Sequence, residues 1–315
     1  MPHLLIARTV HVDGMRLLRE RADWTFTILD APTDAEFMAA LPQADAVLLR
    51  YQPLTAAHVA AAPRLRMVSR HGVGYDTVDT AALAAHEIAL GITPQANASS
   101  VAEHTLALLL AVARRINVCN ASVREGAWQQ GIGTESFFEL EGKTALIVGA
   151  GRIGRAVADR LRAFDMAVQF YDPLLAPPSP AVNDLPAALG QADVVSLHVP
   201  LTETTHHLVD PMQCKRGAII INTARGGVLD GARLHEALNS GHLYGAGLDV
   251  FEQEPPASNQ PLLAHSHLVC TPHVASLSDG ALRRMACESV QNVLDFFDGC
   301  PRPGALVDLN TALKV

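Results

Sequence analysis

The chain has 315 residues, of which 49% are apolar and 18% are charged, a composition typical of globular proteins rather than of disordered ones. The net charge of −8 and the lack of any basic cluster argue against nucleic-acid binding, because phosphates are held by lysine and arginine. The five cysteines are scattered and form no Cys-x-x-Cys pair, so we expect neither a disulfide framework nor a metal site.

The start of the chain lacks the basic and apolar stretches of a signal peptide. The longest apolar run, Leu106 to Ala113, is well short of the roughly 20 residues that cross a bilayer. We therefore expect a cytoplasmic protein without a membrane partner.

Short apolar runs alternate with segments of helical periodicity, which is the pattern of a parallel sheet covered by helices. In the first hundred residues, strands are expected at 4–7, 26–29, 46–49 and 67–69, and helices at 12–21, 34–40 and 55–61. One long helix is then predicted from Val101 to Val118, with Ser99 or Ser100 as its N-cap and Glu103 in its first turn. Because its apolar face is wide, this helix is expected to pack between domains or subunits.

The glycine-containing stretch 126–142 predicts a surface loop, after which a second unit begins. Its strands are expected at 144–148, 167–171, 194–199, 218–222, 246–250 and 268–271, and helices at 154–164, 232–239 and 281–297. The last helix is long enough to return to the first unit. We predict an α/β fold of two doubly wound, Rossmann- or flavodoxin-like domains, with domain 101–284 inserted between segments 1–100 and 285–315 of the other.

A glycine-rich turn opens the second unit, where Gly149-Ala150-Gly151-Arg152-Ile153-Gly154 follows an apolar strand and begins a helix. Gly149 permits a tight turn, Gly151 permits close approach of a pyrophosphate, and Gly154 permits close packing of helix and strand. Asp172 ends the next strand and can accept hydrogen bonds from ribose hydroxyls. No arginine follows it to receive a 2′-phosphate, so this pattern favours NAD over NADP. The alternative is a purely structural turn, with Asp172 as a strand-end cap.

Three residues at predicted strand ends could carry chemistry. Arg225 can hold a carboxylate at two points, and His273 can act as a general acid. A glutamate beside His273 would favour the protonated ring and fix its orientation. These are the groups that reduction of a 2-keto acid needs. From the residues alone, Arg225 could equally cap a helix, any of the 14 histidines could be a surface residue, and Glu252 competes with Glu254.

Several segments, in chain order, resemble the D-isomer-specific 2-hydroxyacid dehydrogenase family, which includes phosphoglycerate, glyoxylate/hydroxypyruvate and D-lactate dehydrogenases. Ser69-Arg70-His71-Gly72-Val73-Gly74-Tyr75-Asp76 is similar to the family's substrate loop, and residues 100–105 to the start of the helix that follows it. Pro200-Leu201-Thr202 is similar to the loop that touches the cofactor. Residues 222–227, 248–251 and 271–273 resemble the catalytic neighbourhoods.

The resemblance implies a homodimeric, NAD-dependent oxidoreductase that transfers hydride between the cofactor and a small D-2-hydroxy acid. It makes Arg225 the residue that binds and polarises the substrate, His273 the acid/base and Glu254 its partner. Glu254 is preferred to Glu252 because Pro255-Pro256 follows it directly. The implied cofactor-binding residues are Gly149, Gly151, Arg152, Ile153, Gly154, Asp172, Thr205, Thr223, Ala224 and Asp249. The implied substrate-binding residues are Val73, Gly74, Arg70, His71 and Tyr51.

Departures from the family leave the substrate open. Tyr51 stands where phosphoglycerate dehydrogenases usually carry a small hydroxyl residue, and His71 where they often carry alanine. Arg50, Arg70 and His71 are either ordinary surface charges or a site for a second anionic group, as in a substrate of the 3-phosphoglycerate, hydroxypyruvate/glyoxylate or sulfolactate type.

The chain ends too early for the regulatory domain of longer relatives, so feedback through such a domain is not expected. Two other functions stay open: an NAD(H)-sensing, corepressor-like binding protein and a phosphite-type dehydrogenase. Formate oxidation is disfavoured, because the formate dehydrogenases of the family carry glutamine in place of Glu254.

Overall fold

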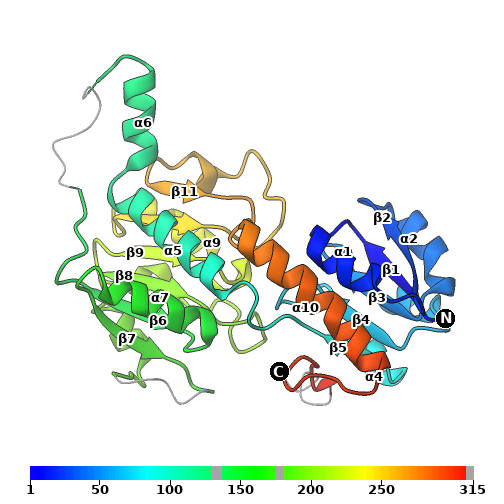
Figure 1. Ribbon diagram of the computed structural model, residues 1–315. Coiled ribbons are helices and arrows are strands. Elements are labelled where there is room, and N and C mark those ends of the chain that lie inside the picture. Colours follow the sequence, from blue (N-terminus) through cyan, green and yellow to red (C-terminus); the bar gives the residue numbers. More distant parts are fainter. Residues whose placement is uncertain (129–136, 175–179, 310–315) are drawn as a thin grey trace. The chain divides into compact units, whose positions relative to one another are not determined.

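The computed structural model describes residues 1–128, 137–174 and 180–309, and the chain divides into two compact units (Figure 1). Unit 1 comprises Met1–Asn97 and Leu277–Val315, and unit 2 comprises Ala98–Ser276. The predicted two-unit α/β fold is confirmed. The predicted boundary at 284/285 is wrong, because it would cut helix α10 (Asp279–Phe297), which belongs to unit 1 as one piece.

Unit 1 is built on a five-stranded parallel sheet with the order β2-β1-β3-β4-β5. Its strands are β1 (His3–Ala7), β2 (Thr25–Leu29), β3 (Ala46–Leu49), β4 (Met67–Arg70) and β5 (Ala89–Gly91). Its helices are α1 (Val12–Arg19), α2 (Asp34–Ala40), α3 (Ala56–Ala60), α4 (Thr80–Ala85) and α10, with a 3₁₀ turn η1 (Leu41–Gln43). Strand β5 and helix α4 were not predicted from the sequence.

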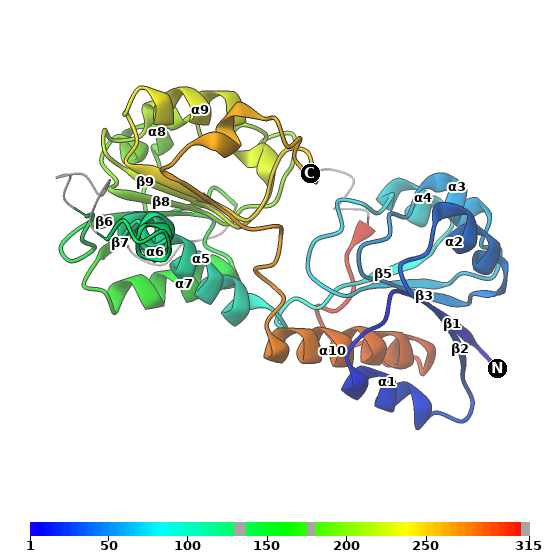
Figure 2. The ribbon, with the colours of Figure 1, turned by 90° about the horizontal axis from the view of Figure 1, so that it is seen from above.

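The strands of unit 1 are buried on both faces, which explains why they read as continuous apolar runs. Leu4 and Ile6 face α1 and α10, while Leu5 and Ala7 face the helices on the opposite side. Figure 2 shows α1 and α10 together below this sheet and α2, α3 and α4 above it. The tail of the chain therefore completes the core of the first unit, as predicted.

Unit 2 is built on a six-stranded parallel sheet with the order β11-β10-β9-β8-β6-β7. Its strands are β6 (Thr144–Val148), β7 (Ala167–Tyr171), β8 (Val194–Leu197), β9 (Ile219–Asn222), β10 (Gly245–Leu248) and β11 (Leu268–Cys270). Its helices are α5 (Ala98–Ala113), α6 (Ile116–Arg124), α7 (Arg152–Arg162), α8 (Leu185–Leu189) and α9 (Gly231–Asn239), with 3₁₀ turns η2 (Pro211–Gln213), η3 (Gly226–Val228) and η4 (Pro261–Ala264).

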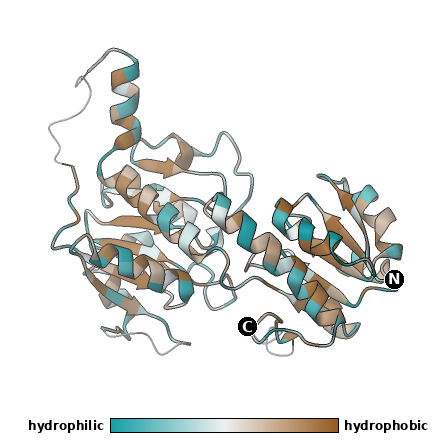
Figure 3. Ribbon diagram, in the orientation of Figure 1, coloured by the Kyte–Doolittle hydropathy of each residue, from teal (hydrophilic) through white to brown (hydrophobic). Residues whose placement is uncertain are grey.

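The inner strands of unit 2 are mostly apolar (Figure 3), and two core clusters lie on the two faces of the sheet. Helices α8 and α9 cover one face, and α5 and α7 cover the other. The order of the strands reverses at β6, which pairs with β7 on one side and β8 on the other. Ligands of doubly wound sheets bind at such a switch point, beyond the carboxyl ends of the strands.

The long helix predicted from Val101 to Val118 is in fact two helices. Arg115 adopts a left-handed backbone (φ 49°), which ends α5, and α6 continues at an angle of 63°. The N-cap prediction is also wrong, because α5 begins at Ala98 and Ser100 lies inside it. Helix α5 packs against α7 and strands β9 to β11 of its own unit.

Of the predicted loop at 126–142, residues 129–136 lie outside the described residues, and the described residues on either side form no helix or strand. Over the described parts of the chain, no single helix has the length and apolarity to cross a membrane; only α5 and α6, taken together as a bent pair, do so.

Candidate active site

The loop after β9 places Arg225. Asn222, the fully buried last residue of the strand, accepts a hydrogen bond from the backbone N–H of Ala224 (3.0 Å) and donates one to the carbonyl of Arg225 (2.9 Å). The next residue, Gly226, has no room for a side chain, since a Cβ would lie 1.9 Å from the carbonyl carbon of Phe251. The Arg225 loop is therefore locked against the segment that follows β10.

That segment and the loop after β11 bring Glu254 and His273 together. Glu254 Oε2 lies 2.7 Å from His273 Nδ1, and Oε1 accepts a hydrogen bond from the backbone N–H of Phe251 (3.0 Å). The His273 backbone is left-handed (φ 53°), and its N–H donates to the Asp249 carbonyl (2.8 Å). Because Nδ1 is taken by the carboxylate, Nε2 is the ring nitrogen that can serve a substrate.

The electrostatics of this pair favour an ionised glutamate. Partial burial raises the pKa of Glu254, but the hydrogen bonds from His273 and Phe251 and the charges of His273 and Arg225 outweigh it. The net result is a pKa below the ordinary value for a glutamate. The positive charge of Arg225 acts on the Glu254 carboxylate, so its guanidinium lies within electrostatic range of the pair.

Glu252, the competing acid, has other partners. Its Oε1 accepts a hydrogen bond from the backbone N–H of Gly231 (2.9 Å) at the start of α9, and its Oε2 lies 3.5 Å from His207 Nε2. The structure thus pairs His273 with Glu254, whereas Glu252 connects the segment after β10 to α9. The sequence held no sign of this second role.

The glycine-rich turn has the shape that a dinucleotide needs. Gly149 has φ +104°, and a Cβ on Gly154 would lie 2.0 Å from the Gly149 carbonyl oxygen, so both glycines are required by the protein itself. A Cβ on Gly151 would meet nothing within 4 Å. The surface over Gly151, at the amino end of α7, is therefore open. Asp172 Oδ2 accepts from the Ala150 N–H (2.8 Å), which fixes the carboxylate beside the turn.

The other residues expected at the cofactor lie around the same edge of the sheet. Arg152 is the exposed first residue of α7, and Ile153 packs onto the core below it. Thr205 donates to the Pro200 carbonyl (2.6 Å) and thereby shapes its own loop. Thr223 is bonded to Thr105 of α5 (2.9 Å). Their contacts with a cofactor remain predictions.

Asp249 is fully buried at the end of β10, and its carboxylate is bonded within the protein. Oδ1 accepts from the Thr271 hydroxyl (2.6 Å) and the Val274 N–H (2.9 Å), and Oδ2 accepts from the Ala275 N–H (2.9 Å). Burial raises the pKa of Asp249, but hydrogen bonds from His104, Thr271 and these backbone groups lower it further, so the group is ionised. Asp249 therefore organises the His273 loop, whatever it contacts besides.

In unit 1, the loop after β4, which is predicted to bind the substrate, presents two backbone donors. Within the part of the chain that the structure describes, the backbone N–H groups of Val73 and Gly74 make no hydrogen bond. Arg70 braces this loop, because its Nε donates to the Gly74 carbonyl (2.9 Å) and its Nη1 to the Arg50 carbonyl (2.9 Å). Two adjacent unused amides are suited to hold a carboxylate.

Two arginines flank Tyr51 at the carboxyl ends of β1 and β3. The guanidinium carbons of Arg8 and Arg50 lie 5.0 and 5.2 Å from the centre of the Tyr51 ring. Neither arginine has a carboxylate partner among the described residues. The sheet order reverses between β1 and β3, so this pair sits at the switch point of unit 1. Sequence reasoning missed Arg8, because only the sheet order brings it to Arg50.

Of the two alternatives left open for His71, the ordinary surface charge is wrong, because its side chain is buried. Burial, together with the charges of Arg50 and Arg70, lowers its pKa to about 4. Near neutral pH the ring is therefore uncharged and adds no positive charge to a site for a second anionic group.

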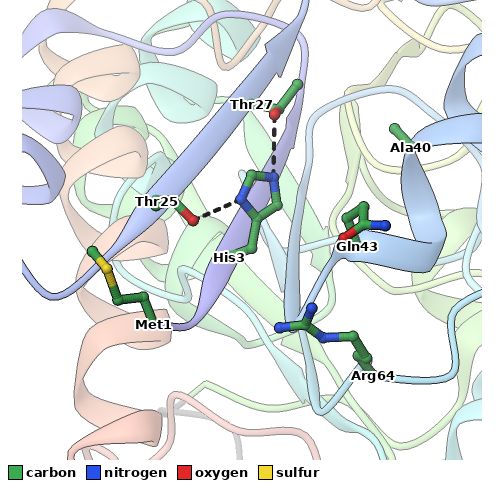
Figure 4. Close-up of a pocket in the computed structure, with 7 residues that line it drawn as sticks. All are labelled: Met1, His3, Thr25, Thr27, Ala40, Gln43 and Arg64. Carbon is green, nitrogen blue, oxygen red and sulfur yellow. Dashed lines mark hydrogen bonds between the residues drawn. The ribbon is translucent and has the colours of Figure 1, made fainter.

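A separate hollow of about 300 Å³ lies at the opposite, amino-terminal edge of the unit 1 sheet (Figure 4). Two of its polar side chains already have partners: both ring nitrogens of His3 contact threonine hydroxyls, of Thr25 (2.8 Å) and Thr27 (3.1 Å), and Arg64 is paired with Asp45. None of the residues predicted to bind substrate or cofactor lines this hollow.

The fold and the site together define a dinucleotide-binding α/β protein with a carboxylate–imidazole pair beside an arginine. Comparison with known proteins makes the class more specific. The family model for the NAD-binding domain of D-isomer specific 2-hydroxyacid dehydrogenases matches residues 106–275. This chain belongs to the D-isomer-specific 2-hydroxyacid dehydrogenase family, so the predicted family and its cofactor, NAD, are confirmed.

Its relatives differ in length and in name. A D-3-phosphoglycerate dehydrogenase of Mycobacterium bovis is 39% identical over 93% of this chain, which spans only 56% of that relative. A glyoxylate reductase of Thermofilum pendens is 36% identical over 100% of this chain and 96% of its own length. The crystal structure of the TT0316 protein from Thermus thermophilus superposes with a TM-score of 0.89 at 37% identity, covering 97% of this chain and 99% of the other.

Proposed function

We propose that this protein interconverts a small D-2-hydroxy acid and its 2-keto acid, with NAD as the redox partner. The observation that carries the proposal is the 2.7 Å pairing of Glu254 with His273, within the electrostatic reach of Arg225. An acid/base, a charge that holds it in its protonated form and a carboxylate-binding cation are what this reaction demands of a protein.

Each side chain has a distinct task in this proposal. Arg225 binds the substrate carboxylate and polarises the 2-oxo group. His273 delivers its Nε2 proton to the carbonyl oxygen during reduction and takes a proton from the hydroxyl during oxidation. Glu254 keeps the ring in one orientation and stabilises its positive charge. The free amides of Val73 and Gly74 give the substrate carboxylate further donors.

The cofactor's place follows from the open surface over Gly151. The helix amino end there would hold the pyrophosphate, and Asp172 would accept hydrogen bonds from the adenosine ribose. When bound, the nicotinamide supplies or accepts the hydride. A carboxylate at position 172 repels a 2′-phosphate, which supports NAD rather than NADP.

We further propose that the substrate carries a second anionic group, held by Arg8 and Arg50. These guanidinium groups lack carboxylate partners within the described chain, and stacking on Tyr51 keeps both at the switch point of unit 1. Candidates are the 2-keto acids related to 3-phosphoglycerate and sulfolactate. Glyoxylate, which has only one anionic group, is the matched control.

The direct test is NADH oxidation by the purified full-length protein with a panel of 2-keto acids. We expect turnover that His273→Ala lowers by about 10² to 10⁴-fold, with NADH affinity unchanged. Binding of NADH without turnover of any acid would contradict the proposal and favour an NAD(H)-sensing protein. Turnover that survives in His273→Ala would contradict the acid/base assignment.

The second-anion proposal has its own test. Arg8→Gln should raise KM for a phosphorylated or sulfonated 2-keto acid about five- to tenfold, because one charge-assisted contact is lost. KM for glyoxylate should not change. Equal changes for both substrates would contradict a role for Arg8 in recognising the second group.

We also propose that the protein is a cytoplasmic homodimer. Helix α6 projects from the rest of unit 2 in Figure 1, and its side chains Ile116 and Val123 are 51% and 59% exposed. Sedimentation of the wild type and of Val123→Asp measures whether this helix contributes to an assembly. A monomeric wild type would contradict the proposal.

A further inference from the structure

A series of side-chain hydrogen bonds inside unit 2 links helix α5 to the loop that carries His273. His104, in the middle of α5, places Nε2 2.8 Å from the Thr271 hydroxyl and 3.4 Å from Asp249 Oδ1. The Thr271 hydroxyl lies 2.6 Å from the same carboxylate oxygen. The His104 side chain is only 22% exposed, so these contacts are largely shielded from water.

The direction of these bonds is fixed by chemistry. Asp249 is ionised and can only accept, so the single hydroxyl hydrogen of Thr271 points to Asp249. The oxygen of Thr271 must then accept from His104, whose Nε2 therefore carries a hydrogen. The His104 N–H thus donates to the Thr271 hydroxyl, which in turn donates to the Asp249 carboxylate.

Asp249, the last member of this series of hydrogen bonds, holds the loop that carries His273. The Asp249 carboxylate accepts from the N–H groups of Val274 and Ala275, and its backbone carbonyl accepts from the N–H of His273. His273 has a left-handed backbone, which is unfavourable for a residue with a side chain and persists only where surrounding contacts impose it. The orientation of the His273 ring thus depends on how well Asp249 is held.

Helix α5 makes two further bonds of the same kind. The Ser100 hydroxyl donates to the Ala275 carbonyl (2.7 Å), on the far side of the His273 loop. Thr105 donates to the Val101 carbonyl (2.8 Å), so it accepts from the Thr223 hydroxyl (2.9 Å) in the loop that leads to Arg225. One edge of α5 therefore touches both loops from which the catalytic groups of unit 2 project.

From these contacts we infer that His104 is a positioning residue: through Thr271 and Asp249 it holds the loop of His273 in its catalytic conformation. The inference rests on the proposed function, because it assigns His104 to the same acid/base. It requires the N–H donor of His104 and not merely the volume of its ring.

Two substitutions distinguish the effect of the His104 N–H donor from the effect of the volume of its ring. His104→Leu fills similar space without a donor, whereas the side-chain amide of His104→Gln can still donate to Thr271. We expect kcat to fall about tenfold in the leucine variant and to stay within about threefold of the wild type in the glutamine variant. The dissociation constant for NADH should not change in either. Glu103→Gln, an exposed neighbour on α5 that pairs only with Arg160 among the described residues, is the matched control.

A double-mutant cycle tests the pathway. In a Thr271→Val background, which already lacks the hydroxyl link, His104→Leu should cost less than about twofold in kcat. An equal tenfold loss in both backgrounds would overturn the inference, because the effect would not pass through Thr271. Equal losses in the leucine and glutamine variants, or wild-type kcat in both, would also overturn it.

Hydrogen exchange gives a readout that does not depend on turnover. The amides of Val274 and Ala275 should exchange faster in His104→Leu than in the wild type and in His104→Gln. The exchange rates of the amides in strand β8 should be the same in all three proteins. Unchanged exchange at 274–275 would overturn the inference. If the wild type turns over none of the acids, the proposed function fails and the exchange experiment still decides whether His104 holds the loop.

Discussion

At the residue scale, the site separates two glutamates that stand only two positions apart. Glu254 pairs with the imidazole of His273, while Glu252 caps the amino end of α9 through Gly231. A carboxylate bonded to a helix amino end is stabilised where it is, so it is poorly placed to assist proton transfer elsewhere. Because Glu254 and not Glu252 contacts His273, substitution of Glu254 tests the proposed support of the acid/base.

Glu254→Gln should lower kcat for 2-keto acid reduction about 100-fold, because the protonated ring of His273 loses its anionic partner. The basic limb of the pH–rate profile should move to lower pH, since the active, protonated form becomes harder to maintain. Steady-state kinetics between pH 5 and 9 measure both effects. As control, Glu252→Gln should leave the pH profile in place; a shift in that variant instead would reverse the assignment.

At the element scale, the sequence located what local patterns determine. The apolar runs at β1 and β6 and the glycine spacing after β6 are local signals, and the structure has these elements within one or two residues of prediction. The segments predicted to be catalytic were identified by resemblance to a family, because nothing local distinguishes His273 from the other histidines. The roles predicted for His273 and Glu254 came from that resemblance. The 2.7 Å contact between the two side chains is the geometric observation that supports them.

What could not be predicted depends on contacts that are distant in sequence. The helix break falls at Arg114-Arg115, two residues that favour helix, so the left-handed backbone of Arg115 is imposed by packing and not by propensity. The link from His104 to Thr271 spans 167 residues, and the approach of Arg8 to Tyr51 depends on the order of the strands. Such features become visible only when the topology is known.

The glycine turn allows a prediction that separates binding from folding. Gly151→Ala should leave the free energy of unfolding within about 0.5 kcal/mol of the wild type, because the new Cβ meets no protein atom within 4 Å. The same methyl group would stand in the cofactor's path, so the dissociation constant for NADH should rise about tenfold or more.

Gly154→Ala, three residues along the same turn, is the matched comparison. Its Cβ would collide with the Gly149 carbonyl oxygen at 2.0 Å, and we expect a loss of about 1 to 3 kcal/mol in stability. Urea unfolding and NADH fluorescence titration distinguish the two variants. Unimpaired NADH binding by folded Gly151→Ala would show that the dinucleotide does not pass over this turn.

At the scale of the whole molecule, each unit has an uncharged histidine at the carboxyl edge of its sheet, buried in unit 1 and partly buried in unit 2. His71 follows β4 in unit 1, and burial lowers its pKa to about 4. His198 follows β8 in unit 2, and burial lowers its pKa to about 3. Each has one ring nitrogen that is buried without a partner among the described residues, so protonation in the folded state has no nearby acceptor to stabilise it.

These two histidines predict how stability depends on pH. In the unfolded chain a histidine takes up a proton near pH 6.5, whereas these two do so in the folded protein only near pH 4 and pH 3. Between those values the unfolded state binds more protons, so acidification favours unfolding. Each histidine should remove up to about 1.4 kcal/mol of stability per pH unit below pH 6.5.

Urea unfolding at pH 7, 6 and 5 measures this slope in a window above the titration of ordinary carboxylates. The paired carboxylates Asp249 and Glu254 have lowered pKa values and lose their stabilising contribution only at lower pH. His71→Asn, which keeps a polar side chain but cannot take up a proton, should flatten the slope by about 1.4 kcal/mol per pH unit. If stability rises on acidification, or if the slope of the asparagine variant equals that of the wild type, His71 is not held in its neutral form by the fold.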